Sequence, residues 1–158
     1  MIDFSFEPRS DDGSWSSDWR PARPDLNPSD FCLKYFKADL RLVVHGVDLS
    51  VRLLGEPVVD VALMLEYARN ELETVGDITV EASLTQHAYS FRREGTTVTL
   101  TTQWPPARAE LTWSELQQLA DRARAEAFRL ITARPSGAAG ERVAAGAGGV
   151  LADRMRPS

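Results

Sequence analysis

The sequence is poor in the residues that most often form cross-linked, metal-binding or nucleophilic sites. Cys32 is the one cysteine among its 158 residues, so the chain forms no internal disulfide. Cys32 also lies between two apolar residues, which indicates a buried, inert thiol. The two histidines, His45 and His87, are far apart in the sequence and, with Cys32, match no zinc-ligand spacing. We therefore expect no metal site formed by neighbouring residues and no cofactor.

Motifs that bind phosphates or activate a nucleophile are also missing. The chain contains no Gly-x-Ser-x-Gly elbow, no Walker sequence and no Gly-x-Gly-x-x-Gly fingerprint. These absences identify no catalytic residue and favour a protein that is not an enzyme. They leave open a site assembled from Asp, Glu and Arg residues that are distant in the sequence.

Strongly basic segments and long apolar runs are absent as well. Lys and Arg number 18 against 23 Asp and Glu, for a net charge of −5. The N-terminus has neither the basic start nor the apolar stretch of a signal peptide. We therefore expect a cytoplasmic protein that binds neither nucleic acid nor membranes. Lys34 and Lys37 are the only lysines, and this bias towards arginine indicates a high-GC bacterial genome.

Composition divides the chain into three regions. Residues 1–30 are rich in proline, aspartate and serine, and we predict an irregular N-terminal arm. The aromatic residues of this arm, Trp15 and Trp19 among them, either pack onto the domain, cover a sheet face or become ordered on a partner. Residues 31–135 have the periodicities of one folded domain. Residues 136–158 are rich in Gly and Ala, which predicts a disordered tail.

The first half of the domain reads as a hairpin followed by a helix. Apolar and polar residues alternate over 38–45 and 49–53, on either side of Gly46, which is typical of two half-buried strands. Gly55-Glu56-Pro57 is expected to break the second strand. From residue 58 apolar residues recur every three or four positions, predicting an amphipathic helix that ends near Gly76.

The second half reads as three strands followed by a helix. Short alternating segments around 78–81, 89–92 and 97–101 predict the strands, with a tight turn at Glu94-Gly95. Trp104-Pro105-Pro106 is expected to end them. Thr112 and Glu115 have the spacing of a capping box, which predicts a helix from there to just before Pro135.

The element order β-β-α-β-β-β-α predicts an α+β fold. We expect one mainly antiparallel five-stranded sheet with both helices packed on one of its faces. The opposite face would then be open to solvent, either as an ordinary wet face or as a contact surface for a protein. Its candidate binding residues are Asp39, Arg41, His45, Arg52, Glu81, Arg92 and Thr99.

Asp60 is a separate candidate, because it stands among apolar residues at the start of the first predicted helix. One interpretation is that it binds the free N–H groups of that helix end. The other is a partly buried carboxylate at the mouth of a site. A deep pocket lined by Asp60, His87 or Tyr89 would favour an enzyme, and a solid core there would argue against one.

The stretch 36–44, the segment 55–60 and the later hairpins resemble small bacterial domains of unknown function and bacterial immunity proteins. That resemblance implies an acidic, cytoplasmic α+β protein that neutralises a toxin without catalytic residues of its own. The first functional hypothesis is thus a protein-binding module, immunity- or antitoxin-like, whose partner is a protein such as a basic toxin. The alternative is a small accessory enzyme of bacterial secondary metabolism with an Asp/Glu/Arg site between sheet and helices. A third alternative is a homo-oligomer paired through an edge strand.

Overall fold

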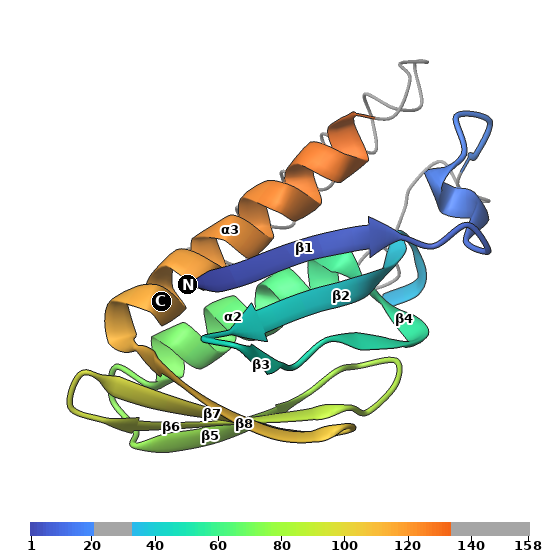
Figure 1. Ribbon diagram of the computed structural model, residues 1–158. Coiled ribbons are helices and arrows are strands. Elements are labelled where there is room, and N and C mark those ends of the chain that lie inside the picture. The colour runs from blue at the N-terminus through green and yellow to red at the C-terminus, as the bar shows by residue number, and fades with distance from the viewer. Residues whose placement is uncertain (21–32, 134–158) are drawn as a thin grey trace.

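Two antiparallel sheets and two long helices make up the part of the chain that the computed structural model describes, residues 1–20 and 33–133 (Figure 1). The predictions for Cys32 and for residues 136–158 lie outside these described residues. No helix within them is long and apolar enough to cross a membrane. The elements, in chain order, are β1 (Ile2–Pro8), the short 3-10 helix η1 (Gly13–Trp15), β2 (Lys37–Val44), β3 (Val47–Asp48), β4 (Val51–Pro57), α2 (Val58–Glu71), β5 (Asp77–Glu81), β6 (Ala88–Glu94), β7 (Thr97–Gln103), β8 (Pro106–Thr112) and α3 (Trp113–Thr132).

The first sheet, sheet A, consists of β1, β2, β3 and β4, with β2 at its centre. The hairpin predicted around Gly46 is present, since β2 pairs antiparallel with both β3 and β4. The expected break at Gly55-Glu56-Pro57 is wrong, because β4 continues through these residues to Pro57. A register shift opposite Ala38 and Leu40 and the positive φ of Gly55 accommodate this irregular stretch within the ladder.

The N-terminal segment corrects the prediction that residues 1–30 are an irregular arm. Residues 2–8 form β1, which pairs antiparallel along the whole length of β2 and buries Phe4 and Phe6. Beyond β1, Trp15 and Trp19 pack against Phe36, with ring centroids 5.2 and 5.4 Å apart. The Trp15 indole also donates to the Lys37 carbonyl at 2.7 Å. The interpretation in which the aromatics pack onto the domain is therefore confirmed.

The second sheet, sheet B, is the meander β5-β6-β7-β8. Its first three strands match the three predicted after the helix, and Gly95 supplies the positive φ of the β6–β7 turn. Trp104-Pro105-Pro106 is a turn rather than an end, because β8 follows at once and pairs with β7. The α+β class is confirmed, whereas the single five-stranded sheet is wrong: the strands divide into two sheets.

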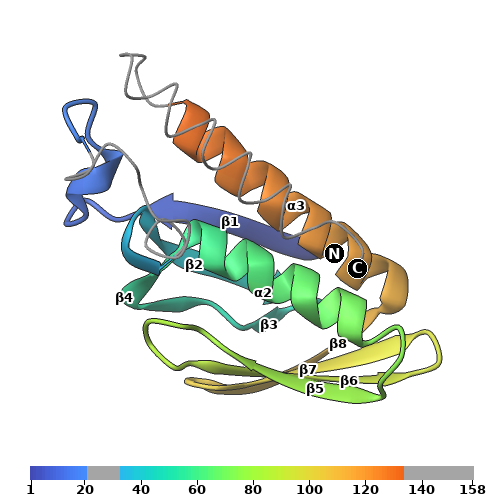
Figure 2. The same cartoon turned by 180° about the vertical axis from the view of Figure 1, so that it is seen from behind.

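Helix α2 lies at the centre of the molecule and explains why two sheets are needed. Figures 1 and 2 show sheet A along one side of α2, sheet B along a second and α3 along a third. Val59 and Met64 are buried although they stand outside the predicted apolar stripe. Because apolar residues extend around much of α2, one sheet covers too little of its surface. Helix α3 buries one face only, as predicted, and begins with the capping box of Thr112 and Glu115.

Candidate functional site: a groove between helix α2 and strand β5

The residues predicted to share one open sheet face lie on two different sheets. Asp39 and Arg41 stand on the outer face of sheet A, and Arg52 is exposed on β4. His45 lies in the turn between β2 and β3. Glu81, Arg92 and Thr99 belong to sheet B. The predicted face is therefore wrong as a single surface, because it assumed one continuous sheet.

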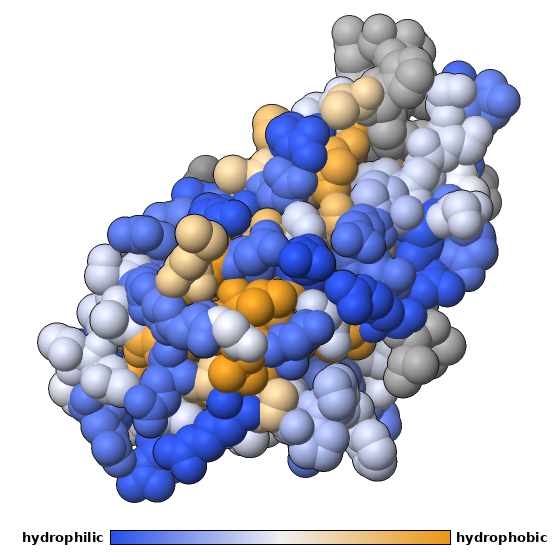
Figure 3. Space-filling model, in the orientation of Figure 1, coloured by the Kyte–Doolittle hydropathy of each residue, from blue (hydrophilic) through white to orange (hydrophobic). Residues whose placement is uncertain are grey.

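Most of the charged members of that set have partners within the chain. Asp39 accepts from Arg9 at 2.8 Å, and Arg41 donates to Asp3 at the same distance. His45 Nε2 lies 3.1 Å from Glu115, and Arg92 pairs with Glu94 at 3.0 Å. The surface over sheet A is accordingly mainly hydrophilic, with a few apolar residues near its middle (Figure 3). Internal pairing leaves these charges less available to a partner.

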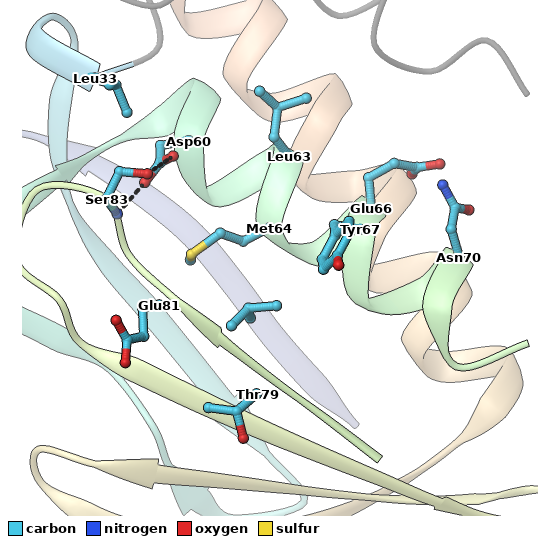
Figure 4. A pocket seen from close by; sticks show the side chains of 11 residues that line it. Leu33, Asp60, Leu63, Met64, Glu66, Tyr67, Asn70, Thr79, Glu81 and Ser83 are labelled. Atoms are coloured by element: carbon cyan, nitrogen blue, oxygen red, sulfur yellow. Dashed lines mark hydrogen bonds between the residues drawn. The ribbon is translucent and has the colours of Figure 1, made fainter. Parts of the chain in front are cut away.

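An opening lies between α2 and β5, on the side of the molecule that faces the viewer in Figure 2. It is a groove of about 570 Å³. Helix α2 forms one wall and β5, with the loop after it, forms the other (Figure 4). The lining residues are Leu33, Asp60, Leu63, Met64, Glu66, Tyr67, Asn70, Thr79, Val80, Glu81 and Ser83.

The groove combines an apolar floor with negative charge. Tyr67 is 52% exposed although it is aromatic, and Leu63 on the same helix is partly exposed beside it. Asp60, Glu66 and Glu81 supply three carboxylates, and the described residues that line the groove include neither lysine nor arginine. Glu66 is paired with Arg69, which stands just outside the lining. Such a surface suits a partner that is partly apolar and partly basic.

Asp60 holds the loop after β5 against the start of α2. Its carboxylate accepts from the Ser83 backbone N–H at 3.0 Å and from the Ser83 hydroxyl at 2.9 Å (Figure 4). Asp60 is buried and lines the end of the groove. The interpretation of Asp60 as a carboxylate at the mouth of a site stays a prediction. The carboxylate binds the loop rather than the N–H groups of its own helix end.

A second group of polar side chains is buried behind Asp60. Glu56, only 1% exposed, accepts from the Thr85 hydroxyl through Oε1. Its Oε2, His87 Nε2 and the Tyr89 hydroxyl have no hydrogen-bond partner among the described residues. The rings of His87 and Tyr89 meet edge to face, with centroids 4.7 Å apart. We call Glu56, Thr85, His87 and Tyr89 the buried polar cluster.

Burial sets the protonation of this cluster. Desolvation raises the pKa of Glu56; the Thr85 hydrogen bond opposes this shift and the nearby charge of Asp60 adds to it. Desolvation and the charge of Glu56 also raise the pKa of Tyr89. Desolvation lowers the pKa of His87, which favours the neutral imidazole. The cluster is therefore biased towards uncharged forms.

Only part of the pocket that would favour an enzyme is present among the described residues. Asp60 lines the groove, but Tyr89 borders an apolar cavity of about 10 Å³, which is at the lower limit for one water molecule. His87 is buried. No group of three or more potential metal ligands occurs in residues 1–20 and 33–133.

Strand β5 is the edge strand of sheet B, and bonds at its two ends fix the direction of its backbone groups. Gly76 O accepts from Arg93 N at 2.8 Å, and Ala82 N donates to His87 O at 2.9 Å. Along an antiparallel strand, successive residues turn their N–H and C=O groups to opposite sides. The even-numbered residues of β5 therefore bond to β6, and the odd-numbered residues face away from it.

The outward-facing residues of β5 are Asp77, Thr79 and Glu81. Within the described part of the chain, no hydrogen bond satisfies their outward N–H and C=O groups. The outer edge of β1 differs, because Arg122 of α3 donates to two of its carbonyls, those of Ile2 and Phe4. Exposed strand edges are sites where another chain can pair. The edge of β5 borders the groove, since Thr79 and Glu81 belong to both.

Sequence reasoning singled out Asp60, Glu81, His87 and Tyr89 but missed the groove that Asp60 and Glu81 line. The α2 residues of the groove carry a weak signal, because Leu63 and Tyr67 lie four apart and outside the predicted buried stripe. The sequence gives no sign that Glu56 is buried, because a carboxylate beside proline is typical of a turn.

Comparison with known proteins adds no relationship to this description: no family model, curated protein or solved structure matches the chain.

Proposed function

We propose that this protein is a non-enzymatic binding module that holds a protein partner in the groove between α2 and β5. The observation that carries the proposal is the lining of the groove, in which exposed apolar side chains lie beside three carboxylates and the described residues include no lysine or arginine. Exposed apolar surface is costly to leave in water, and the exposed carboxylate of Glu81 beside it is complementary to a basic partner. An immunity- or antitoxin-like role towards a basic toxin is the concrete form of this function.

Site-specific photo-crosslinking in the native host tests the proposal. The photoreactive amino acid p-benzoylphenylalanine replaces Tyr67 in the groove or, as a matched control, Phe128 on α3. The two positions are comparably exposed, at 52% and 43%. We expect one protein to crosslink at position 67 and not at 128, with a yield that falls in the Glu81→Lys background. Equal products at both positions, or none at 67, would contradict the proposal.

A small accessory enzyme is the second candidate, and the buried polar cluster is the observation that favours it. Unpaired polar atoms inside a protein are uncommon, and they concentrate at functional sites. A metabolite that raises the melting temperature of the wild type, but not of Glu56→Gln or Tyr89→Phe, would support this candidate. Identical responses from all three proteins would argue against it.

A further inference from the structure

The backbone of β5 indicates how a partner binds in the groove. We propose that the partner contributes an extended segment that pairs antiparallel with β5 and becomes a fifth strand of sheet B. This segment carries basic side chains on one side and apolar side chains on the other. The inference rests on the proposed function and names the binding mode and the chemistry of the partner.

The backbone of β5 supplies the template for this strand. Asp77, Thr79 and Glu81 present N–H and C=O groups along the edge, and within the described residues none of these groups has a hydrogen-bond partner. An added strand lies about 4.8 Å from β5, where it satisfies all of them at once. The remainder of the sheet is antiparallel, and antiparallel pairs are slightly more stable than parallel ones, so we assign that direction.

The two faces of sheet B determine which side chains the segment carries. Val80 is buried and Ile78 packs against the core, so this side of β5 faces α2. Apolar side chains of the added strand on the same side meet Leu63 and Tyr67 of the groove. On the outer side Asp77 and Glu81 are exposed, and basic side chains there lie opposite carboxylates. A period-2 basic and apolar pattern satisfies both sides.

A second copy of this chain is a poor occupant of the same edge. Symmetric antiparallel pairing of two β5 strands around Thr79 places Asp77 of each copy opposite Glu81 of the other. Like charges directly opposite each other destabilise a strand pair. The acidic side chains of β5 therefore disfavour pairing with a second β5 strand and favour pairing with a basic strand.

Synthetic peptides test this binding mode on the intact protein. The probe is a fluorescein-labelled peptide of alternating lysine and valine, and its binding is measured by fluorescence anisotropy. In an antiparallel pair, residues that exchange hydrogen bonds carry their side chains on the same face. The lysines are therefore the residues whose amides bond to Asp77, Thr79 and Glu81. We expect N-methylation of the lysine amides to abolish binding and N-methylation of the valine amides to spare it. Equal effects of the two modifications would overturn strand addition, and loss only with methylated valines would overturn the antiparallel register.

Two substitutions of Thr79 give an independent test on the protein side. Thr79→Pro removes an outward N–H while leaving every backbone hydrogen bond from β5 to β6 in place. Thr79→Ala is the matched control, because both variants lose the hydrogen bond between the Thr79 and Ser90 hydroxyls, 3.0 Å apart. We expect the peptide affinity of Thr79→Pro to be at least tenfold lower than that of Thr79→Ala. Circular dichroism checks whether both variants are folded. If Thr79→Pro is unfolded, the N-methylated peptides test the proposal on the wild-type protein.

Failure of strand addition is distinguishable from failure of the proposed function. Two results together would overturn strand addition alone. A partner protein crosslinks at position 67, and Thr79→Pro binds the peptide as tightly as Thr79→Ala does. Absence of any crosslink at position 67 would overturn the function on which this inference rests.

Discussion

Glu56 is the residue at which burial and charge conflict most directly. Its side chain is almost completely inaccessible to solvent, and its Oε2 has no partner among the described residues. Ionising such a group costs free energy that one hydrogen bond from Thr85 offsets only in part. A carboxylate here reduces the stability of the folded chain at neutral pH.

The pH dependence of stability tests this interpretation of Glu56. Since the pKa of Glu56 is raised on folding, the folded chain retains a proton that the unfolded chain has already released. The stabilisation that this retained proton gives is therefore fully present below the pKa of Glu56 in the unfolded chain. It is lost as the pH rises through the pKa of Glu56 in the folded chain. Glu56→Gln removes this dependence. We expect the stability of the variant relative to the wild type to increase as the pH rises above the ordinary pKa of glutamate, about 4.3.

Urea unfolding of both proteins at pH values below and above this pKa measures the increase. Glu73→Gln, at an exposed position, is the control and should follow the wild type. A difference between Glu56→Gln and the wild type that does not change with pH would contradict a raised pKa.

At the scale of elements, β1 makes the N-terminal segment part of the folded domain. Phe4 and Phe6 lie within the core, on the face of β1 that packs inward. We expect Phe6→Ala to lower the free energy of unfolding by about 3–5 kcal/mol, the cost of deleting a buried ring. Phe128→Ala on the exposed side of α3 should cost less than about 1 kcal/mol. Chemical denaturation measures both, and equal costs would mean that β1 is peripheral.

The elements that sequence reasoning recovered are those with an uninterrupted pattern. Strands β2, β5, β6 and β7 alternate cleanly, and α3 has one apolar stripe behind a capping box. Strands β1 and β8 alternate too, with Phe4 and Phe6 in one and Ala109 and Leu111 in the other. They were missed because prolines beside them indicate irregular structure, and a proline at the end of an edge strand leaves pairing intact.

At the scale of the whole molecule, the division into two sheets determines where the candidate site lies. Sheet A, sheet B and α3 lie along three sides of α2 (Figure 2). Residues on its remaining side line the groove. This arrangement was not predictable from local periodicity, because the decisive contacts join distant residues. Asp60 and Ser83 are 23 positions apart, and Glu56 and Thr85 are 29 apart. Hydrogen bonds at such separations leave no pattern in the sequence.

Charge on the edge of β5 also makes a prediction about association. In Glu81→Lys, the symmetric pairing of two β5 strands would place opposite charges across from each other, each pair contributing roughly 0.2–1 kcal/mol. We expect this variant to self-associate more strongly than the wild type in sedimentation-velocity experiments at equal concentration. Glu73→Lys makes the same change of charge away from the edge and is the control. Equal association of the two variants would assign the effect to net charge rather than to β5.

The central claim is that the edge of β5 is open and receives a partner strand, and amide hydrogen exchange followed by NMR tests it most directly. In the free protein we expect the amides of Thr79 and Glu81 to exchange rapidly and those of Ile78 and Val80 to be protected by their bonds to β6. Adding the lysine–valine peptide should protect Thr79 and Glu81 and leave Ile78 and Val80 unchanged. Protection of Thr79 and Glu81 already in the free protein, or no gain on adding the peptide at a concentration that saturates binding, would contradict the claim.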